Sequence, residues 1–449
     1  MGCTDFELQV TGYRLKRQGP GSRVTKKLSG DTSNKFRKRE RLGQSGREEE
    51  GGTMGREGIK EQGSVLTFSA AEYERRHRKI REKMQLRGID CLVITGHNGG
   101  FGSAGADIRY VSGLPGAILT DGPYILFPQF GEPIGIASSP FAAAWAAKTT
   151  SIPMKPVSFK KGTRLRDYTT DVVARIKELD LERGTIGIVT MRVMPAYVYA
   201  GLQKELPHAN LVSAGDILLE CRMIKSKEEI AFMRKSGECA DKGMEAIVEA
   251  ARPGITETEL VAMCDAAMVR AGSERGNFIL LGSGAWSEME GTISGGTRRS
   301  LNKGDIIFTE ITSNYQGYYT QLCCPISLGG KLPDSFKKFL EIEKAMYRLA
   351  YEELRPGNTV SAIDAKVAKL AASLGGDFRR AWALQVSEAA ESFFKLDNEL
   401  QPGMCYVIHP WAEPRSGKGY NGHTVGNTCV VTEGAPEVLN KAPLELRAL

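Results

Sequence analysis

The sequence predicts an α/β (α+β) protein with two folded domains, and three patterns indicate this. Helical and strand patterns alternate from about residue 64 to residue 217, which is typical of an α/β domain. Residues 218–449 contain two similar stretches 103 positions apart, 251–272 and 354–375. A hairpin of two amphipathic strands, 304–330, lies between these stretches. At 449 residues the chain is long enough for two or three domains.

The first 63 residues are expected to be a disordered basic tail. They are rich in glycine and charge, with 14 Lys or Arg against 9 Asp or Glu, and show no apolar periodicity. Such a segment buries too little apolar surface to offset the entropy lost on ordering. An alternative interpretation is a leader that precedes the true translation start at Met54. Because most of the net charge of +7 falls in this tail, we do not expect the folded body to bind nucleic acid.

The first domain, residues 64–217, is expected to open with a charged helix from Ser69 to Leu86. Apolar runs that suit strands follow this helix, and a second long helix is expected near 165–180. The expected strands are 90–95, 124–128, 132–137 and 185–190.

The second domain, residues 218–449, is expected to consist of two similar halves. Ser226 and Glu229 form a capping-box pattern at a helix start, and Pro253 and Gly254 end that helix. Each of the two similar stretches reads as a helix end, a Pro-Gly stop, a threonine and a second amphipathic helix. The spacing is too long for a solenoid repeat, so we expect two helices and antiparallel strands in each half, with a site between the halves.

The hairpin "GDIIFTEITSNYQGYYTQLCCPISLGG" places polar groups on a face that is otherwise apolar. Glu310 continues the alternation of Ile306 and Phe308, and Gln321 occupies the same kind of position on the second strand. An inward carboxylate must find a partner or lower the stability of the fold. We therefore expect Glu310 and Gln321 to belong to a buried polar cluster.

Composition excludes several classes of protein. The sequence contains no run of 18 or more apolar residues that could span a membrane. Its start has neither the basic flank nor the apolar stretch of a signal peptide. The nine cysteines form no CxxC pair and lie mostly in apolar segments. We therefore expect the cysteines to be buried, reduced thiols of a cytoplasmic protein.

Five stretches together resemble the creatinase/aminopeptidase P/prolidase family, metallopeptidase family 24, over about residues 70–449. They are "ADIRYVSGLPG", "RMIKSKEEIAFMRKSGECADKGMEA", "LNKGDIIFTEITSNYQGYYTQL", "LQPGMCYVIHPWAEP" and "GNTCVVTEG". The resemblance implies a creatinase-like N-terminal domain followed by a catalytic domain with the two-halved pita-bread fold. It also implies a homodimer, because similar enzymes with this N-terminal domain usually pair.

The family's metallopeptidases bind two divalent metal ions through two Asp, one His and two Glu, and this chain departs from that pattern. Carried over one at a time, these positions fall on Glu310, Gln321, Arg380, His409 and Gly426. None keeps the family's ligand, and an arginine, which stays protonated, cannot bind a metal ion. The prediction is therefore no metal and no cofactor.

The resemblance to creatinase implies hydrolysis of a C–N bond by protein acid and base groups. His409 is then the expected general base or acid, because histidine titrates near neutral pH. Glu310 or Glu388 would orient it, and Arg380 would hold a substrate carboxylate. Three further residues are expected to line the substrate pocket: Gln321, His423 and Glu290. The segment before Gly304, where similar enzymes have another histidine, has none, so creatine itself is not the expected substrate.

Several alternatives stay open at this point. The cluster could be structural, with Arg380 as the ion partner of Glu310. The favoured function is a metal-independent hydrolase that acts on a small amino-acid or short-peptide substrate. A non-catalytic relative that binds a ligand or another protein is the second hypothesis. A metal-dependent Xaa-Pro aminopeptidase or dipeptidase is the third.

Overall fold

The computed structural model describes residues 67–449 except for short internal segments, so the predicted tail lies outside the described residues. The segments left out are 96–104, 115–121, 151, 190, 192–193, 276, 290–294, 387–398, 417–418 and 421, with the side chains of 380, 382, 385 and 386. Residues Val65–Leu449 belong to one compact unit. None of the described helices is long and apolar enough to cross a membrane.

The first domain is built on a six-stranded sheet with the order β4-β3-β2-β1-β5-β6. Its strands are β1 (Cys91–Thr95), β2 (Tyr124–Pro128), β3 (Ile134–Ala137), β4 (Met154–Pro156), β5 (Thr185–Ile188) and β6 (Asn210–Ser213). All five residues of β1 and of β2 are buried, because these strands lie in the middle of the sheet with helices on both faces. The strands predicted from apolar runs are confirmed to within a few residues.

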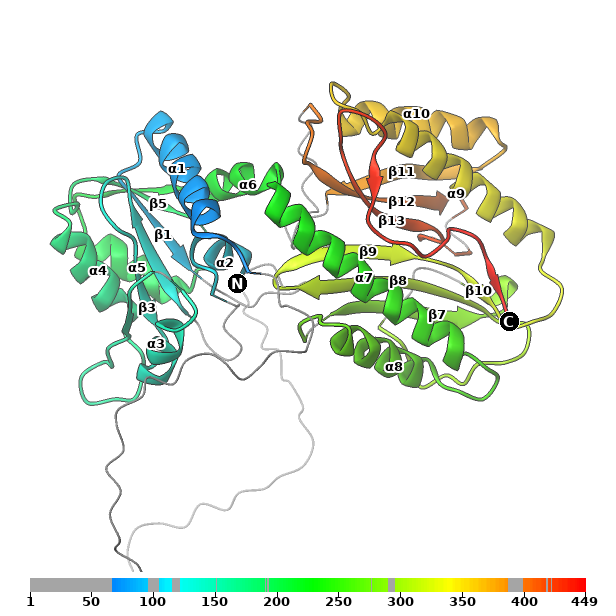
Figure 1. Cartoon of the computed structure of the whole chain (residues 1–449), viewed down its shortest axis with the longest axis horizontal. Helices are drawn as coiled ribbons and strands as arrows, with labels where there is room; N and C mark the ends of the chain where they lie inside the picture. The colour runs from blue at the N-terminus through cyan, green and yellow to red at the C-terminus, as the bar shows by residue number, and fades with distance from the viewer. Residues whose placement is uncertain are drawn as a thin grey trace, which may run out of the picture. The chain divides into compact units, whose positions relative to one another are not determined.

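The helices of this domain cover the sheet from both sides (Figure 1). They are α1 (Ala70–Leu86), α2 (Ala106–Ser112), α3 (Pro140–Ala146), α4 (Tyr168–Glu178), α5 (Ala196–Glu205) and α6 (Gly215–Met223). The predicted helix from Ser69 to Leu86 is confirmed as α1, and Ser69 caps it, since its side chain accepts a hydrogen bond from the Glu72 amide. Helix α6 buries Ile217, Leu218 and Cys221 in the same apolar core as α1 and β1.

The second domain contains two helix pairs of matching design. The first pair is α7 (Lys227–Ala250) and α8 (Glu257–Arg270), and the second is α9 (Asp334–Glu353) and α10 (Val360–Ser373). The predicted capping box of Ser226 and Glu229 is confirmed at the start of α7. Thr256 caps α8, and Thr359, 103 positions later, caps α10. The internal similarity thus reflects two halves, each with its own helix pair.

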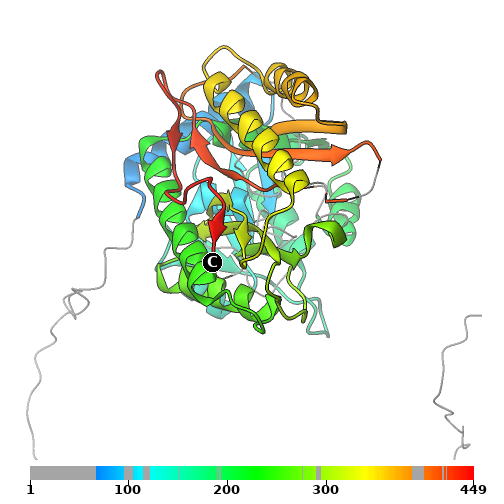
Figure 2. The same ribbon diagram turned by 90° about the vertical axis from the view of Figure 1, so that its right-hand side faces the viewer.

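One sheet connects the two halves. Its strand order is β11-β12-β13-β9-β8-β10-β15, while β7 pairs with β8 and β14 pairs with β13. The bounds are β7 (Phe278–Gly284), β8 (Ile306–Tyr315), β9 (Tyr318–Cys323), β10 (Ile326–Ser327), β11 (Phe378–Val386), β12 (Cys405–Pro414), β13 (Gly426–Val430), β14 (Glu437–Val438) and β15 (Arg447–Ala448). Figures 1 and 2 show α7 and α8 beside β7–β9, and α9 and α10 beside β11–β13. Each helix pair buries its own apolar cluster against its half of the sheet.

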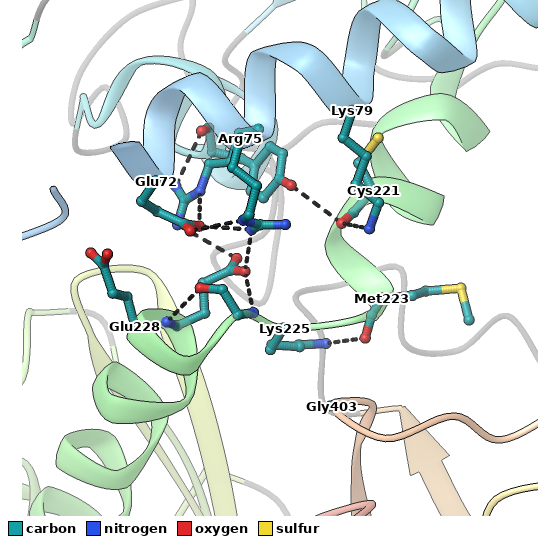
Figure 3. Close-up of polar contacts among 12 residues, drawn as sticks. Glu72, Arg75, Lys79, Cys221, Met223, Lys225, Glu228 and Gly403 are labelled. Atoms are coloured by element: carbon teal, nitrogen blue, oxygen red, sulfur yellow. Dashed lines mark hydrogen bonds and ion pairs between the residues drawn. The ribbon is translucent and has the colours of Figure 1, made fainter. Parts of the chain in front are cut away.

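A polar network joins the first domain to the second around Glu229. The Glu229 carboxylate accepts hydrogen bonds from Arg75 (3.0 Å) and from the Tyr318 hydroxyl (2.9 Å) at the β8–β9 turn. Arg76, which is 0% exposed, donates to Glu72 (2.7 Å) and to the Tyr318 hydroxyl (3.0 Å). Figure 3 shows the Glu72 and Arg75 side chains on α1 within this network. The network thereby ties α1 to the tip of the predicted hairpin.

Candidate functional site

Four adjacent strands carry four of the five positions where the family resemblance implies metal ligands. Glu310 lies on β8, Gln321 on β9, Gly426 on β13 and His409 on β12. Strand β9 of the first half pairs with β13 of the second half. The cluster therefore lies where the two halves of the sheet meet, as the two-halved pattern predicts.

Glu310 is a buried carboxyl group whose surroundings favour its neutral form. Its side chain points to the same face as Gln321, whose amide donates to Glu310 Oε2 (3.4 Å) and to Thr312 Oγ1 (3.1 Å). Burial raises the pKa of Glu310 from 4.5 to about 7. The predicted polar cluster of Glu310 and Gln321 is confirmed.

His423 presents an imidazole nitrogen to Glu310. Its Nδ1 lies 2.8 Å from the Pro410 carbonyl oxygen, which can only accept, so Nδ1 carries the proton. The lone pair is then on Nε2, which lies 4.0 Å from Glu310 Oε1. Burial lowers the pKa of His423 to about 4, so the ring is neutral at physiological pH. A carboxyl that keeps its proton up to about pH 7 and an unprotonated imidazole nitrogen thus face one another in a buried space.

His409 stacks on His423. The ring centroids are 3.7 Å apart and the planes differ by 6°. Burial, together with the neighbouring His423, lowers the pKa of His409 well below its usual value of 6.5. Trp411 packs edge-on against the other imidazole, with its ring centroid 4.8 Å from that of His423. Both histidines are therefore held as neutral, oriented rings.

Gly426 leaves no space for a side chain opposite His409. A Cβ atom at position 426 would lie 2.6 Å from the His409 Cβ and 2.7 Å from the Ile408 carbonyl oxygen. Such contacts are far shorter than van der Waals distances, so even alanine would push β12 and β13 apart. The close approach of these strands therefore requires glycine here.

The comparisons with known proteins agree with this architecture. A family model described as Metallopeptidase family M24 matches residues 231–433, and one described as Creatinase/Prolidase N-terminal domain matches residues 76–224. The chain belongs to the creatinase, aminopeptidase P and prolidase superfamily. Its second domain therefore has the pita-bread fold of that superfamily, and its first domain is creatinase-like.

Two curated relatives and one solved structure illustrate the similarity. The probable dipeptidase PepE of Mycobacterium tuberculosis is 28% identical over 52% of this chain, a match that spans 63% of the relative's length. The creatinase of a Bacillus species is 25% identical over 84% of this chain and 92% of its own length. The Xaa-Pro dipeptidase from Bacillus anthracis superposes with a TM-score of 0.70 at 20% identity, over 84% of this chain and 100% of that structure.

The described residues do not fit the two-metal centre expected of metallopeptidases in this superfamily. That centre needs several carboxylates to neutralise two cations, whereas these positions offer a carboxyl at Glu310, an amide at Gln321 and an imidazole at His409. The close packing of Gly426 leaves no space for a carboxylate at the last position.

A single ion also fits poorly, although Glu310, His409 and His423 place one potential ligand atom each within 4.8 Å of one another. An imidazole binds a metal along the nitrogen lone pair, which lies in the plane of the ring. Two parallel rings stacked 3.7 Å apart share no such point. One ring would have to turn away from its stacked position before both could bind the same ion.

The structure brings four of the seven predicted site residues to one region: Glu310, Gln321, His409 and His423. Glu388 and Glu290 lie outside the described residues. The Arg380 backbone pairs with Glu413, four residues from His409 along β12, but its side chain is outside the described part of the chain. Its predicted contacts with Glu310 and with a substrate carboxylate stay predictions. The eight described cysteines are buried and outside disulfides, as predicted.

Glu343 was missed from the sequence because its helix is rich in charged residues. Its side chain lies on α9 and is 0% exposed. It belongs to the same region as Glu310, since burial and then the charges of both carboxyls raise the pKa of Tyr420. The spacing of the apolar residues around Glu343 could have indicated its burial. Phe339 and Leu340 precede Glu343 by four and three residues, and Met346 follows it by three, so the acid lies on the apolar face of the helix.

The raised pKa of Glu310 predicts a pH-dependent stability difference for Glu310→Gln. The unfolded chain ionises near pH 4.5 and the folded chain near pH 7, so ionisable Glu310 lowers stability progressively between these values and by about 3 kcal/mol above pH 7. Glutamine does not ionise, so the variant avoids this loss of stability. The variant should therefore gain about 1 kcal/mol over wild type at pH 5 and about 3 kcal/mol at pH 8.

Denaturant unfolding at the two pH values measures this gain. Glu182→Gln, which changes an exposed acid, serves as the control and should show no such trend. A gain for Glu310→Gln that does not grow with pH would mean that Glu310 ionises normally in the folded protein.

Proposed function

We propose that this protein is a hydrolase that cleaves a C–N bond in a small amino-acid or peptide-like substrate with protein acid and base groups instead of metal ions. The observation that carries the proposal is the buried pair of Glu310, with a pKa of about 7, and His423, with an unprotonated Nε2 at 4.0 Å. Carboxyl and imidazole groups at hydrogen-bonding reach of a substrate are the usual partners of general acid–base catalysis.

The two groups divide the reaction between them. His423 Nε2 accepts a proton from water as the water oxygen attacks the substrate carbon. The Glu310 carboxyl donates its proton to the nitrogen as the C–N bond breaks, so the amine leaves without charge. The proton on His423 then returns to the Glu310 carboxylate, and the site regains its resting state. One water is consumed, and no proton is gained or lost overall.

The neighbouring residues support this division of roles. The Gln321 amide donates to Glu310 Oε2, which leaves Oε1 as the oxygen that faces His423. His409 stacks against His423 and keeps its ring plane fixed. In this proposal His409 orients the base rather than acting as the base, which revises its expected role. Arg380 and Glu290 remain proposed contacts of the substrate, and Glu388 remains a proposed catalytic residue that orients a histidine.

The relatives bear on the substrate class. A probable dipeptidase and a creatinase both match the chain, so its substrate is proposed to be a small molecule with an amide or amidine C–N bond. The structures named Xaa-Pro dipeptidase or prolidase favour a second candidate function, metal-dependent cleavage of Xaa-Pro peptides. The poor fit of the described residues to two metal ions argues against it.

The metal content of the purified protein separates these two functions. After loading with Mn, Co or Zn and extensive dialysis, the wild-type protein is expected to retain far less than one equivalent of metal per chain. His423→Gln is the matched control, because it removes one nitrogen of the candidate ligand group. Two retained equivalents would overturn the metal-free proposal, and one equivalent that is lost in His423→Gln would assign a single-metal site instead.

The assembly and compartment expected from the sequence are part of this proposal. A homodimer and a cytoplasmic location both suit a member of this superfamily that acts on small substrates. Light scattering of the full chain during size-exclusion chromatography tests the first, because the mass of one chain is 49.0 kDa. A mass of one chain at micromolar concentration would contradict the homodimer.

A further inference from the structure

Glu343 is a completely buried acid beside the proposed catalytic pair. Its Oε2 accepts a hydrogen bond from the Thr424 backbone N–H (2.8 Å) and a second from the Thr424 hydroxyl. Its Oε1 has no hydrogen-bond partner among the residues that the structure describes. Burial raises the pKa of Glu343 well above 4.5, although the two bonds from Thr424 oppose the shift.

Thr424 follows His423 directly, so Glu343 holds the segment that carries the proposed base. Two other bonds fix the same segment. The Tyr420 hydroxyl donates to the His423 carbonyl oxygen (2.9 Å), and the His423 ring donates to the Pro410 carbonyl oxygen (2.8 Å). Glu343 supplies the third anchor, and it comes from α9 rather than from β12 or the segment that follows it.

An acid at this position lowers the stability of the fold compared with an apolar residue. The same face of α9 is otherwise apolar, with Phe339, Leu340 and Met346 in the core. Burying a carboxyl with one oxygen unpaired costs free energy that a leucine or methionine would not. The carboxyl interrupts the apolar face where α9 meets Thr424. This placement links its presence to the position of residues 423–424.

We propose that Glu343 is a positioning residue: through Thr424 it holds the His423 imidazole in the Nδ1–H tautomer with Nε2 directed at Glu310. The consequence for catalysis rests on the proposed function, whereas the claim about the His423 ring does not. An imidazole keeps its tautomer only while its donor remains aligned with one acceptor. A shift of the 423–424 backbone would move Nδ1 away from the Pro410 carbonyl and let the proton exchange between the two nitrogens.

Nitrogen NMR of the full chain labelled with [15N]histidine tests this directly, because the sequence has only five histidines. His423→Gln assigns the His423 signals. In wild type and in Glu343→Gln, whose amide oxygen can still accept from Thr424, His423 is expected to be protonated at Nδ1 alone. In Glu343→Met, which keeps the volume but not the acceptor, His423 is expected to populate both tautomers.

Glu257→Gln is the matched control, since Glu257 is another buried acid that accepts bonds from backbone and hydroxyl groups, at Ser283 and Thr297. It should leave the His423 signals unchanged. If Glu343→Met fails to fold, Thr424→Val removes one of the two hydrogen bonds that Glu343 accepts from Thr424 and should shift the tautomer ratio by a smaller amount. A folded Glu343→Met or Thr424→Val with wild-type His423 signals would overturn the proposal.

Activity gives a second, separable readout once a substrate is found. Glu343→Met is expected to lower kcat about tenfold with little change in KM, and Glu343→Gln is expected to restore most of it. A changed tautomer in a protein without hydrolase activity would uphold the positioning role and reject the proposed function. Activity that survives in Glu343→Met with an altered tautomer would reject His423 as the base.

Discussion

Glu310→Gln is expected to lower kcat/KM for C–N bond hydrolysis by about 100-fold or more, because it removes the proton that the leaving nitrogen needs. Glutamine keeps the size and the hydrogen-bonding shape of the side chain, so the site should remain intact. The loss should appear mainly in kcat, since the donated proton is needed in the transition state rather than for binding. Substrates for the assay are a panel of Xaa-Pro dipeptides, N-substituted amidines and guanidines, and cyclic amides.

The pH profile distinguishes proton donation from a structural role of Glu310. The wild-type kcat/KM should fall as pH rises through about 7, where Glu310 loses its proton, and also fall below about pH 4, where His423 gains one. In Glu310→Gln the limb near pH 7 should vanish from whatever activity remains. A glutamine variant that keeps this limb would show that another group supplies the proton.

Asp241→Asn provides a control for the removal of a buried acid. Burial raises the pKa of Asp241, whose carboxylate accepts bonds from the backbone of Lys441 and Ala442. It should leave kcat/KM within about threefold of wild type. If Asp241→Asn and Glu310→Gln reduce activity equally, the loss reflects general destabilisation and not catalysis.

Glu229→Ala is expected to destabilise the protein by about 3–5 kcal/mol, the usual cost of removing one partner of a buried ion pair. The Glu229 side chain is 2% exposed and that of Arg76, 3.5 Å away, is 1% exposed. The substitution also removes the acceptor of the Ser226 amide in the capping box and of the Tyr318 hydroxyl. Chemical denaturation followed by tryptophan fluorescence measures the loss.

Glu228→Ala is the neighbouring control, since Glu228 accepts hydrogen bonds from the Ser69 amide and hydroxyl at the exposed start of α1. It should cost less than about 1 kcal/mol. Glu229→Gln should fall between the two, because the amide oxygen can still accept from Ser226 and Tyr318. Equal losses for Glu228→Ala and Glu229→Ala would mean that the network around Arg76 adds little to stability.

Local patterns predicted most of the architecture because they depend on residues close in sequence. Ser69, Ser226 and Thr256 each cap the helix that follows, and a cap needs only the next three residues. The alternation in the 304–330 hairpin likewise fixed which face Glu310 and Gln321 would share. Only the tertiary structure places His423 beside Glu310 and Glu343 beside Thr424. Their spacing along the chain reveals neither the stacked imidazole nor the anchor at Thr424.

The sequence by itself determined the two-domain plan and the internal duplication, and it predicts that the superfamily's metal ligands are replaced at five positions. Each of these is a property of residue identity and spacing. Only the tertiary structure decided which acid meets which base, because Glu310, Glu343 and His423 come from three separate parts of the chain, up to 113 residues apart. Their ionisation follows from burial, which raises the pKa of a carboxyl and lowers that of an imidazole. Burial depends on the packing of the whole domain, so no local pattern could supply it.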